Sequence, residues 1–344
     1  MTSVYIGAFG RDLDVATADP DTGALTVTGT VPDVPDASFL AVSPDRHTLY
    51  ATNELARDGT VTALDIHDPQ HPVVLNHAPA GAAPTHLSVH PSGRYLLTAN
   101  YGDGTVAVHP LLPGGALGEP TDLVQHNGTE PHAHHVVTDP SGQWVLATDL
   151  GADSVLVYRL TLDNGRLALH QRFHLPPGAG PRHLAFHPHG RHTYLLGEHR
   201  SEITVATWDP TTGTLTATSV VPTTSATNAP AEIAITRDGK HLYASNRGEN
   251  TIAHFTIHDG GARIAHVAST PTDDWPRHFN LSPGERFVYV ANQRAGTITQ
   301  HPRDPDTGHL SPAVAATRVD NVAVIAFLEP PPPHGRMPAA EQVM

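Results

Sequence analysis

Short apolar runs alternate with turn residues along the whole chain. One example is an apolar run at Leu184–Phe186, a turn at His187–Gly190 and a second apolar run at Tyr194–Leu196. Pro188 has a restricted φ angle and Gly190 can adopt a positive φ, so these residues suit a tight reversal of the chain. The pattern predicts one strand, a tight turn and a second strand that returns beside the first.

The same turn recurs at intervals of 46 to 49 residues. Its six copies are Ser43–Arg46, His90–Gly93, Asp139–Gly142, His187–Gly190, Thr236–Gly239 and Ser282–Glu285. Each copy lies between two apolar runs, a third run follows, and a Gly-containing turn then leads to a fourth. That last turn is repeated nearly unchanged at Asp19–Leu25, Asp209–Leu215 and Asp304–Leu310.

Four short strands in each unit of about 45 residues are typical of a β-propeller blade. Six units are complete. The N-terminal segment Val4–Thr30 supplies strands two to four of another blade, and Asp320–Phe327 has the apolar pattern of its missing innermost strand. Pairing these two ends closes the ring and removes the sheet edges that favour aggregation. We predict an all-β, seven-bladed β-propeller as a single domain over residues 1–328, followed by a disordered, Pro-rich tail over residues 329–344.

Composition fits this architecture and narrows the function. A length of 344 residues alone suggests about two domains, but 29 Gly and 32 Pro suit one domain of many short strands. The chain has no Cys, which excludes disulfides and thiolate metal sites, and no signal-peptide pattern at Met1–Gly10, so we expect a cytoplasmic protein. A net charge of −14 argues against nucleic-acid partners, and no apolar run reaches the roughly 20 residues that span a membrane. The sequence does not set the oligomeric state, and a monomer is compatible with it.

In an antiparallel pair, the start of the first strand and the end of the second lie at the same end of the sheet. Because blades radiate from a central channel, these positions converge at its mouth. The last residue of the second strand is nearly constant, which indicates a structural role, since Asn and Asp bond nearby backbone. In the six complete units it is Asn53, Asn100, Asp149, Gly197, Asn246 and Asn292.

Two neighbouring positions at the mouth vary from blade to blade. A scaffold role predicts one residue type at each position, whereas variety indicates a binding site, and a cleft with several arginines and carboxylates is a default site. After the second strand the residues are Glu54, Tyr101, Leu150, Glu198, Arg247 and Gln293. At the start of the first strand they are Ser38, Thr85, His134, Arg182, Ala231 and Arg277.

The adjoining position of the first strand carries four histidines. Its residues are Phe39, His86, His135, His183, Glu232 and His278. We attribute the recurring histidine to the repeat itself and to hydrogen bonds between blades. No His-Glu-x-x-His motif or carboxylate-rich loop is present, so we predict no metal. Glycine fingerprints for phosphates or dinucleotides and a Gly-x-Ser-x-Gly elbow are also absent, so we predict no cofactor and disfavour a serine hydrolase.

Several motifs resemble those of a known family. They are Pro131–His134, Gly178–Pro188, Ala231–Ile233, Ala244–Gly248 and Trp275–Phe279. Together they resemble the seven-bladed β-propeller lactonase family, which contains the propeller-type 6-phosphogluconolactonases and the fungal 3-carboxy-cis,cis-muconate lactonizing enzymes. The similarity extends over almost the whole predicted propeller, and the signatures of WD-repeat and kelch propellers are absent.

In the muconate branch, the resemblance implies an active site of one histidine, two arginines and one glutamate. By motif these fall on His134, Arg182, Arg247 and Glu198, four of the positions that vary between blades. We therefore predict these four as catalytic residues. We predict as substrate-binding residues Arg277, His86, Tyr101, His183, Glu232 and Gln293.

Hydrolysis of a lactone needs an activated water and a stabiliser for the tetrahedral oxyanion. We predict a metal-independent lactonase for a small anionic substrate, with 6-phosphogluconolactone as the leading candidate. Arg182, Arg247 and Arg277 suit the anchoring of a phosphate or carboxylate, because arginine binds such groups in a bidentate manner. Glu198 or His134 would be the general base.

Two other interpretations stay open. The same site suits a cyclisation of the muconate-lactonizing type or a specialised biosynthetic isomerisation, in which arginines hold carboxylates while His134 or Glu198 moves a proton at carbon. A non-enzymatic propeller that binds proteins ranks third, because fold alone does not define function, although only 6% of residues are aromatic. The chain departs from the family motifs at Gly197, where Asn is usual, and at Ala234, where many members have His; both leave the substrate open.

Overall fold

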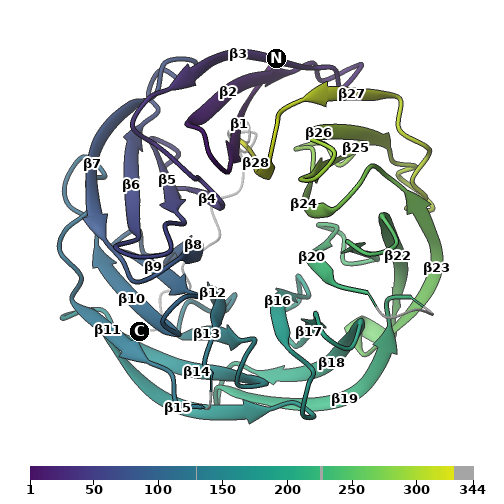
Figure 1. Cartoon of the computed structure of the whole chain (residues 1–344). Helices are drawn as coiled ribbons and strands as arrows, with labels where there is room; N and C mark the ends of the chain where they lie inside the picture. Colours follow the sequence, from purple (N-terminus) through teal and green to yellow (C-terminus); the bar gives the residue numbers. More distant parts are fainter. Residues whose placement is uncertain (129, 225–227, 329–344) are drawn as a thin grey trace, which may run out of the picture.

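The computed structural model describes residues 1–128, 130–224 and 228–328, which form a ring of seven four-stranded antiparallel sheets (Figure 1). Blades 1 to 6 are β4–β7, β8–β11, β12–β15, β16–β19, β20–β23 and β24–β27, and blade 7 is β28 with β1–β3. One short 3-10 turn, η1 (Asp259–Gly261), follows β22. The predicted all-β, seven-bladed propeller is confirmed. The predicted Pro-rich tail lies outside the described residues.

The innermost strand of each sheet borders the central channel (Figure 1). These strands are β4 (Leu40–Val42), β8 (Pro84–Val89), β12 (Ala133–Thr138), β16 (Pro181–Phe186), β20 (Pro230–Ile235), β24 (Pro276–Leu281) and β28 (Val322–Phe327). The second strands are the most buried elements, because they pack against both neighbouring blades. They are β1 (Thr2–Ala8), β5 (Thr48–Asn53), β9 (Tyr95–Asn100), β13 (Trp144–Asp149), β17 (His192–Gly197), β21 (His241–Asn246) and β25 (Phe287–Asn292).

The third strands remain largely buried, and the outermost strands face solvent on at least one side. The third strands are β2 (Leu13–Ala18), β6 (Thr60–Asp65), β10 (Thr105–Pro110), β14 (Ser154–Thr161), β18 (Glu202–Asp209), β22 (Thr251–His258) and β26 (Thr297–Pro302). The outermost are β3 (Leu25–Val31), β7 (Val73–Pro79), β11 (Asp122–Gln125), β15 (Arg166–His174), β19 (Thr214–Pro222), β23 (Arg263–Pro271) and β27 (Ala315–Arg318).

The two ends of the chain close the ring in blade 7. Strand β28 pairs antiparallel with β1, with Val4 opposite Phe327 and Ile6 opposite Ile325. These four side chains are buried in one cluster with Tyr289 of blade 6, so closure also completes an interface between blades. The prediction that a C-terminal innermost strand joins three N-terminal strands is therefore confirmed.

The turn between the first and second strands has the predicted geometry. Gly190 has φ 68°, and its N–H donates to the carbonyl of His187 at 2.7 Å. The copies without glycine adopt the same left-handed conformation, with φ 67° at Arg46 and 53° at Glu285. Six sequence copies therefore share one backbone turn, and it lies at the end of each blade opposite the channel mouth.

A hydrogen bond that recurs seven times joins each blade to the next. A buried aromatic side chain on the second strand donates to a backbone carbonyl in the outer turn of the neighbouring blade, at 2.5–3.2 Å. The donors are Tyr5, Tyr50, Tyr95, Trp144, Tyr194, Tyr243 and Tyr289, and the acceptors are Pro69, Gly115, Leu162, Pro210, Gly261, Gly308 and Gly23. We call these contacts the aromatic latch. The last pair joins blade 6 to blade 7, across the point where the ring closes.

Candidate active site

A cavity of about 170 Å³ lies at the mouth of the channel, where innermost strands begin and second strands end. Its lining residues are Glu54, Thr85, Tyr101, His134, Leu150, Arg182, Glu198, Arg247 and Arg277. All nine occupy the two positions that vary between blades. The structure thus brings together six of the ten predicted site residues, which are the four predicted catalytic residues with Tyr101 and Arg277.

A β-bulge at the start of the innermost strand directs side chains to the mouth. In blade 4, Pro181 and His183 pair with successive residues of β17, so Arg182 is the extra residue of the ladder. The same irregularity leaves Thr85, His134 and Arg277 as the unpaired extra residues in blades 2, 3 and 6. An extra residue in one strand re-aims its side chain and recurs next to active sites. In these four of the seven blades, the repeat therefore provides one side chain that is free to face the mouth.

Glu198 is the centre of the charge arrangement in the cavity. Its Oε2 atom lies 3.1 Å from Arg182 Nε and 2.7 Å from an Nη atom of Arg247. Arg247 also donates from Nε to the carbonyl of Ala229 at 2.7 Å, and Arg182 donates to the carbonyl of Ala231. Both arginines are buried, whereas the Glu198 side chain is 20% exposed and faces the cavity. The carboxylate is thus fixed by two cations but remains open to a ligand.

The cavity lining carries a small positive charge. Arg182, Arg247 and Arg277 face two carboxylates, since Arg277 lies 3.6 Å from Glu54. Burial, followed by repulsion from the other two arginines, lowers the pKa of Arg182 to about 9, which leaves it protonated at neutral pH. With three cations and two anions, the lining is suited to an anionic ligand despite the net charge of −14 of the whole chain.

His134 is buried in the wall of the cavity and is neutral at pH 7. Burial, followed by the positive charge of Arg182, lowers the pKa of His134 well below 6.5. Its ring lies edge-on to Tyr101 with centroids 5.8 Å apart, and its Nδ1 atom has no hydrogen-bond partner among the described residues. The Tyr101 ring in turn stacks on the His132 ring, with centroids 4.2 Å apart. The backbone carbonyl of Tyr101 accepts a hydrogen bond from His132 Nδ1 at 2.8 Å. The His134 imidazole is therefore free to accept a hydrogen bond, but the burial and the positive charge that keep it neutral also make it a weak base.

A layer of aromatic rings and one carboxylate lies beneath the cavity. His86 Nδ1 accepts from the backbone N–H of Val136 at 3.3 Å, and His278 Nδ1 accepts from that of Ile325 at 3.4 Å, so these histidines bond the next blade as expected. His183 Nδ1 instead lies 3.0 Å from Glu232 Oε1. The layer packs tightly, with the His86 ring 4.0 Å from Phe39.

Four predicted substrate-binding residues lie outside the cavity lining. His86, His183 and Glu232 belong to the layer beneath it, and Gln293 lies in the loop after β25, where its backbone N–H donates to the carbonyl of Trp275 at 2.9 Å. A direct contact between these four residues and a substrate stays a prediction. Glu54, Thr85 and Leu150 line the cavity but were not predicted as site residues, although each occupies a variable position.

The nearly constant residue at the end of the second strand has the predicted structural role. Asp149 accepts from the backbone N–H of His132 at 2.8 Å and from that of Ala152 at 2.9 Å, and Asn53 donates to the carbonyl of Pro35 at 2.8 Å. In blade 4 a Cβ added to Gly197 would lie 2.9 Å from the carbonyl oxygen of Ala179. A close backbone approach thus accounts for this departure from Asn.

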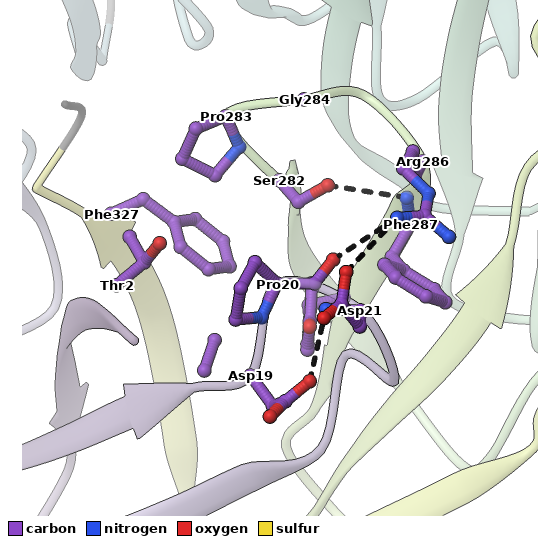
Figure 2. A pocket seen from close by; sticks show the side chains of 12 residues that line it. Thr2, Asp19, Pro20, Asp21, Ser282, Pro283, Gly284, Arg286, Phe287 and Phe327 are labelled. Atoms are coloured by element: carbon purple, nitrogen blue, oxygen red, sulfur yellow. Dashed lines mark hydrogen bonds and ion pairs between the residues drawn. The ribbon is translucent and has the colours of Figure 1, made fainter.

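Larger cavities lie at the opposite end of the blades. One of about 370 Å³, between blades 6 and 7, is lined by Asp19, Pro283, Phe287, Tyr289 and other residues around the latch (Figure 2). A second, of about 350 Å³, occupies the equivalent place between blades 1 and 2, beside Tyr50 of the latch. Because both form where one turn meets the next, we interpret them as a feature of the repeat. No three His, Asp or Glu side chains are arranged to hold a metal ion within the ranges that the structure describes.

Residues 3–327 match the family model described as "Lactonase, 7-bladed beta-propeller". The chain belongs to this lactonase family. A 6-phosphogluconolactonase of Bacillus subtilis is 31% identical over 305 residues, which cover 85% of this chain and 87% of the relative. A 6-phosphogluconolactonase of Pectobacterium carotovorum is 31% identical over 297 residues, covering 84% and 87%.

A solved structure with the same fold is the periplasmic gluconolactonase of Pseudomonas aeruginosa. It superposes with a TM-score of 0.88 at 28% identity and covers 95% of this chain and 98% of its own. The lactonase class predicted from sequence is therefore confirmed, whereas the relatives differ in their named substrate and the cytoplasmic location stays a prediction. No helix of the described ranges has the length and apolar character that a membrane crossing requires.

Proposed function

We propose that this lactonase hydrolyses an anionic sugar lactone, with 6-phosphogluconolactone as the leading candidate, and that it does so without a metal ion. The observation that carries the proposal is the Glu198 carboxylate, which two buried arginines fix beside His134 in a cavity of net positive charge. The names of the curated relatives support the same substrate.

The arrangement supplies the groups that ester hydrolysis requires. A water adds to the lactone carbonyl while Glu198 or His134 accepts its proton, and the carbonyl oxygen becomes an oxyanion. Guanidinium groups of Arg182 and Arg247 stabilise this charge, because they are already oriented and largely shielded from water. The bond between the carbonyl carbon and the ring oxygen then breaks, and the accepted proton returns to the leaving alkoxide. The product is the open-chain hydroxy acid.

The test is hydrolysis of freshly prepared 6-phosphogluconolactone, with the spontaneous ring opening subtracted. We expect a clear rate above background for the wild type and a loss of at least about 100-fold for Glu198→Gln, which cannot accept a proton. Glu119→Gln, at an exposed glutamate remote from the mouth, is the matched control. A wild-type rate equal to the spontaneous rate, with folded protein, would refute this substrate.

A further inference from the structure

The names of the relatives leave open whether the substrate carries a phosphate. The Bacillus subtilis relative is named for a phosphorylated lactone, whereas the Pseudomonas aeruginosa protein is named for gluconolactone. A remote phosphate adds negative charge at a distance from the reacting carbonyl. Recognition of that charge requires a cation that is not already neutralised by a neighbouring carboxylate. The charged groups at the mouth therefore indicate where the protein would distinguish a phosphorylated lactone from an unphosphorylated one.

Arg294 is such a cation. It is exposed, it directly follows Gln293 in the loop after β25, and no carboxylate lies within ion-pair distance of it among the residues described. In contrast, Arg182 and Arg247 share Glu198, and Arg277 lies beside Glu54. Of these four guanidinium groups, Arg294 is the one whose charge stays unbalanced.

Trp275 fixes Arg294 next to the cavity. The Arg294 Cζ atom lies 3.2 Å from the centroid of the Trp275 ring, and Arg247 Cζ lies 5.2 Å from the same centroid. Arg294 and the cavity residue Arg247 thus both contact the indole ring of Trp275. Burial is the main cause that lowers the pKa of Arg247; Glu198 opposes this shift, and the positive charges of Arg277 and, more weakly, of Arg294 add to it.

The backbone around the indole ring is held in an unusual conformation. Trp275 has φ 67°, which is uncommon for a bulky residue, and its N–H donates to Asn250 Oδ1 at 2.9 Å. Its carbonyl accepts from the N–H of Gln293 at 2.9 Å, and Asp274 accepts from Ala295 in the same way at 3.2 Å. These bonds tie the loop that carries Arg294 to the segment that carries the indole, so the cation is positioned rather than free on a mobile loop.

We propose that Arg294, held on Trp275, is a specificity-determining subsite for a phosphate monoester at the end of the substrate remote from the lactone carbonyl. The proposal rests on the proposed function, because Glu198 and the cavity arginines define where the carbonyl binds. The net positive lining of the cavity leaves a dianionic phosphate without full compensation, and Arg294 supplies the additional cation. The subsite favours a phosphorylated lactone over the same lactone without phosphate.

The experiment compares 6-phosphogluconolactone with glucono-δ-lactone for the wild type, Arg294→Ala and Arg94→Ala. Arg94 is the matched control, because it is also exposed and also stacks on an aromatic ring, at 5.8 Å from Tyr95, but it lies in a turn at the opposite end of its blade. We expect the ratio of kcat/KM for the phosphorylated over the unphosphorylated lactone to fall about tenfold in Arg294→Ala, mainly through KM, and to be unchanged in Arg94→Ala.

Calorimetric binding of the two product acids keeps this test independent of turnover. We expect 6-phosphogluconate, but not gluconate, to bind Arg294→Ala about tenfold more weakly than the wild type. If the wild type hydrolyses neither lactone, the proposed function fails, while the binding comparison still decides on the subsite. An unchanged substrate ratio, or an equal loss of binding for both acids, would overturn the role of Arg294 and leave the lactonase proposal intact.

Discussion

His183 Nδ1 lies 3.0 Å from Glu232 Oε1, and this contact joins blade 4 to blade 5 beneath the cavity. Glu232 also accepts from the N–H of Ile233 at 2.9 Å and lies 3.6 Å from His278. A carboxylate in the ring of histidines therefore connects three blades. Its first role in the molecule is to position its neighbours, whether or not it also contacts a substrate.

Replacement of Glu232 with Ala should destabilise the fold. We expect the free energy of unfolding to fall by about 2 kcal/mol, because His183 and the N–H of Ile233 lose a charged acceptor, and to fall by about half as much in Glu232→Gln. Urea denaturation measures both values. The same substitution at the exposed Glu119 controls for loss of charge alone, and a Glu232→Ala protein as stable as the wild type would show that the contact is not stabilising.

The buried histidines predict a steep loss of stability in acid. Burial is the main cause that lowers the pKa of His86, His134, His135 and His183 well below 6.5, and it lowers the pKa of His278 to about 4. Below pH 6.5 the unfolded chain therefore binds more protons than the folded one, so stability is fully present above this pH and falls as the pH decreases. Each such group contributes a slope of up to about 1.4 kcal/mol per pH unit.

One substitution isolates the contribution of a single histidine. Phe39 occupies in blade 1 the position of His86 in blade 2, and the two rings are in contact. We expect His86→Phe to make the dependence of the unfolding free energy on pH shallower by about one proton between pH 6.5 and 4.5. Chemical denaturation across this range provides the measurement. An unchanged slope would mean that His86 is protonated in the folded protein as readily as in the unfolded chain.

The aromatic latch gives a prediction for the point of ring closure. Tyr289→Phe removes the hydroxyl that donates to Gly23, and we expect a loss of about 1 kcal/mol in the free energy of unfolding. Tyr194→Phe makes the same change between blades 4 and 5 and should cost a similar amount. A loss at Tyr194 without a loss at Tyr289 would show that the interface at closure is weaker than this one.

Isotope labelling distinguishes hydrolysis from the cyclase alternative. If Glu198 or His134 activates water, the product acid formed in labelled water gains one heavy oxygen, and no deuterium from the solvent enters a carbon–hydrogen bond. A cyclisation or its reverse moves a proton at carbon and would therefore incorporate deuterium there. Mass spectrometry and NMR of the product separate the two reactions, and carbon-bound deuterium would contradict hydrolysis.

The repeat made most of the architecture predictable. Turn copies at regular intervals defined six blades, and the apolar pattern of the last strand defined the seventh, which the pairing of Val4 with Phe327 confirms. The converging strand ends also indicated the cavity, because antiparallel pairing fixes which positions share an end of the sheet. Position along the repeat is therefore sufficient to find the mouth of the channel.

Depth within the channel could not be predicted in the same way. Arg182 and His183 are consecutive, yet the first lines the cavity and the second lies beneath it, because a bulge separates them. A proline precedes the register shift in four blades, at Pro84, Pro181, Pro230 and Pro276. The sequence does not show that the residue after it is unpaired, so His183 and Glu232 were grouped with the cavity residues. The aromatic latch is partly visible in the sequence, since a Tyr or Trp recurs on the second strand of every blade. Its acceptors are backbone carbonyls, which any residue type can supply, so the sequence does not identify them.

The latch and the strand pairing at closure make this ring different from a linear array of repeats. A solenoid has two terminal repeats, each with a single neighbour, and unfolding can begin at either end and spread. Here every blade has two neighbours and donates one latch bond while it accepts another. With no terminal blade to fray, the first blade to open must break two interfaces at once, so the ring is expected to unfold as one cooperative unit.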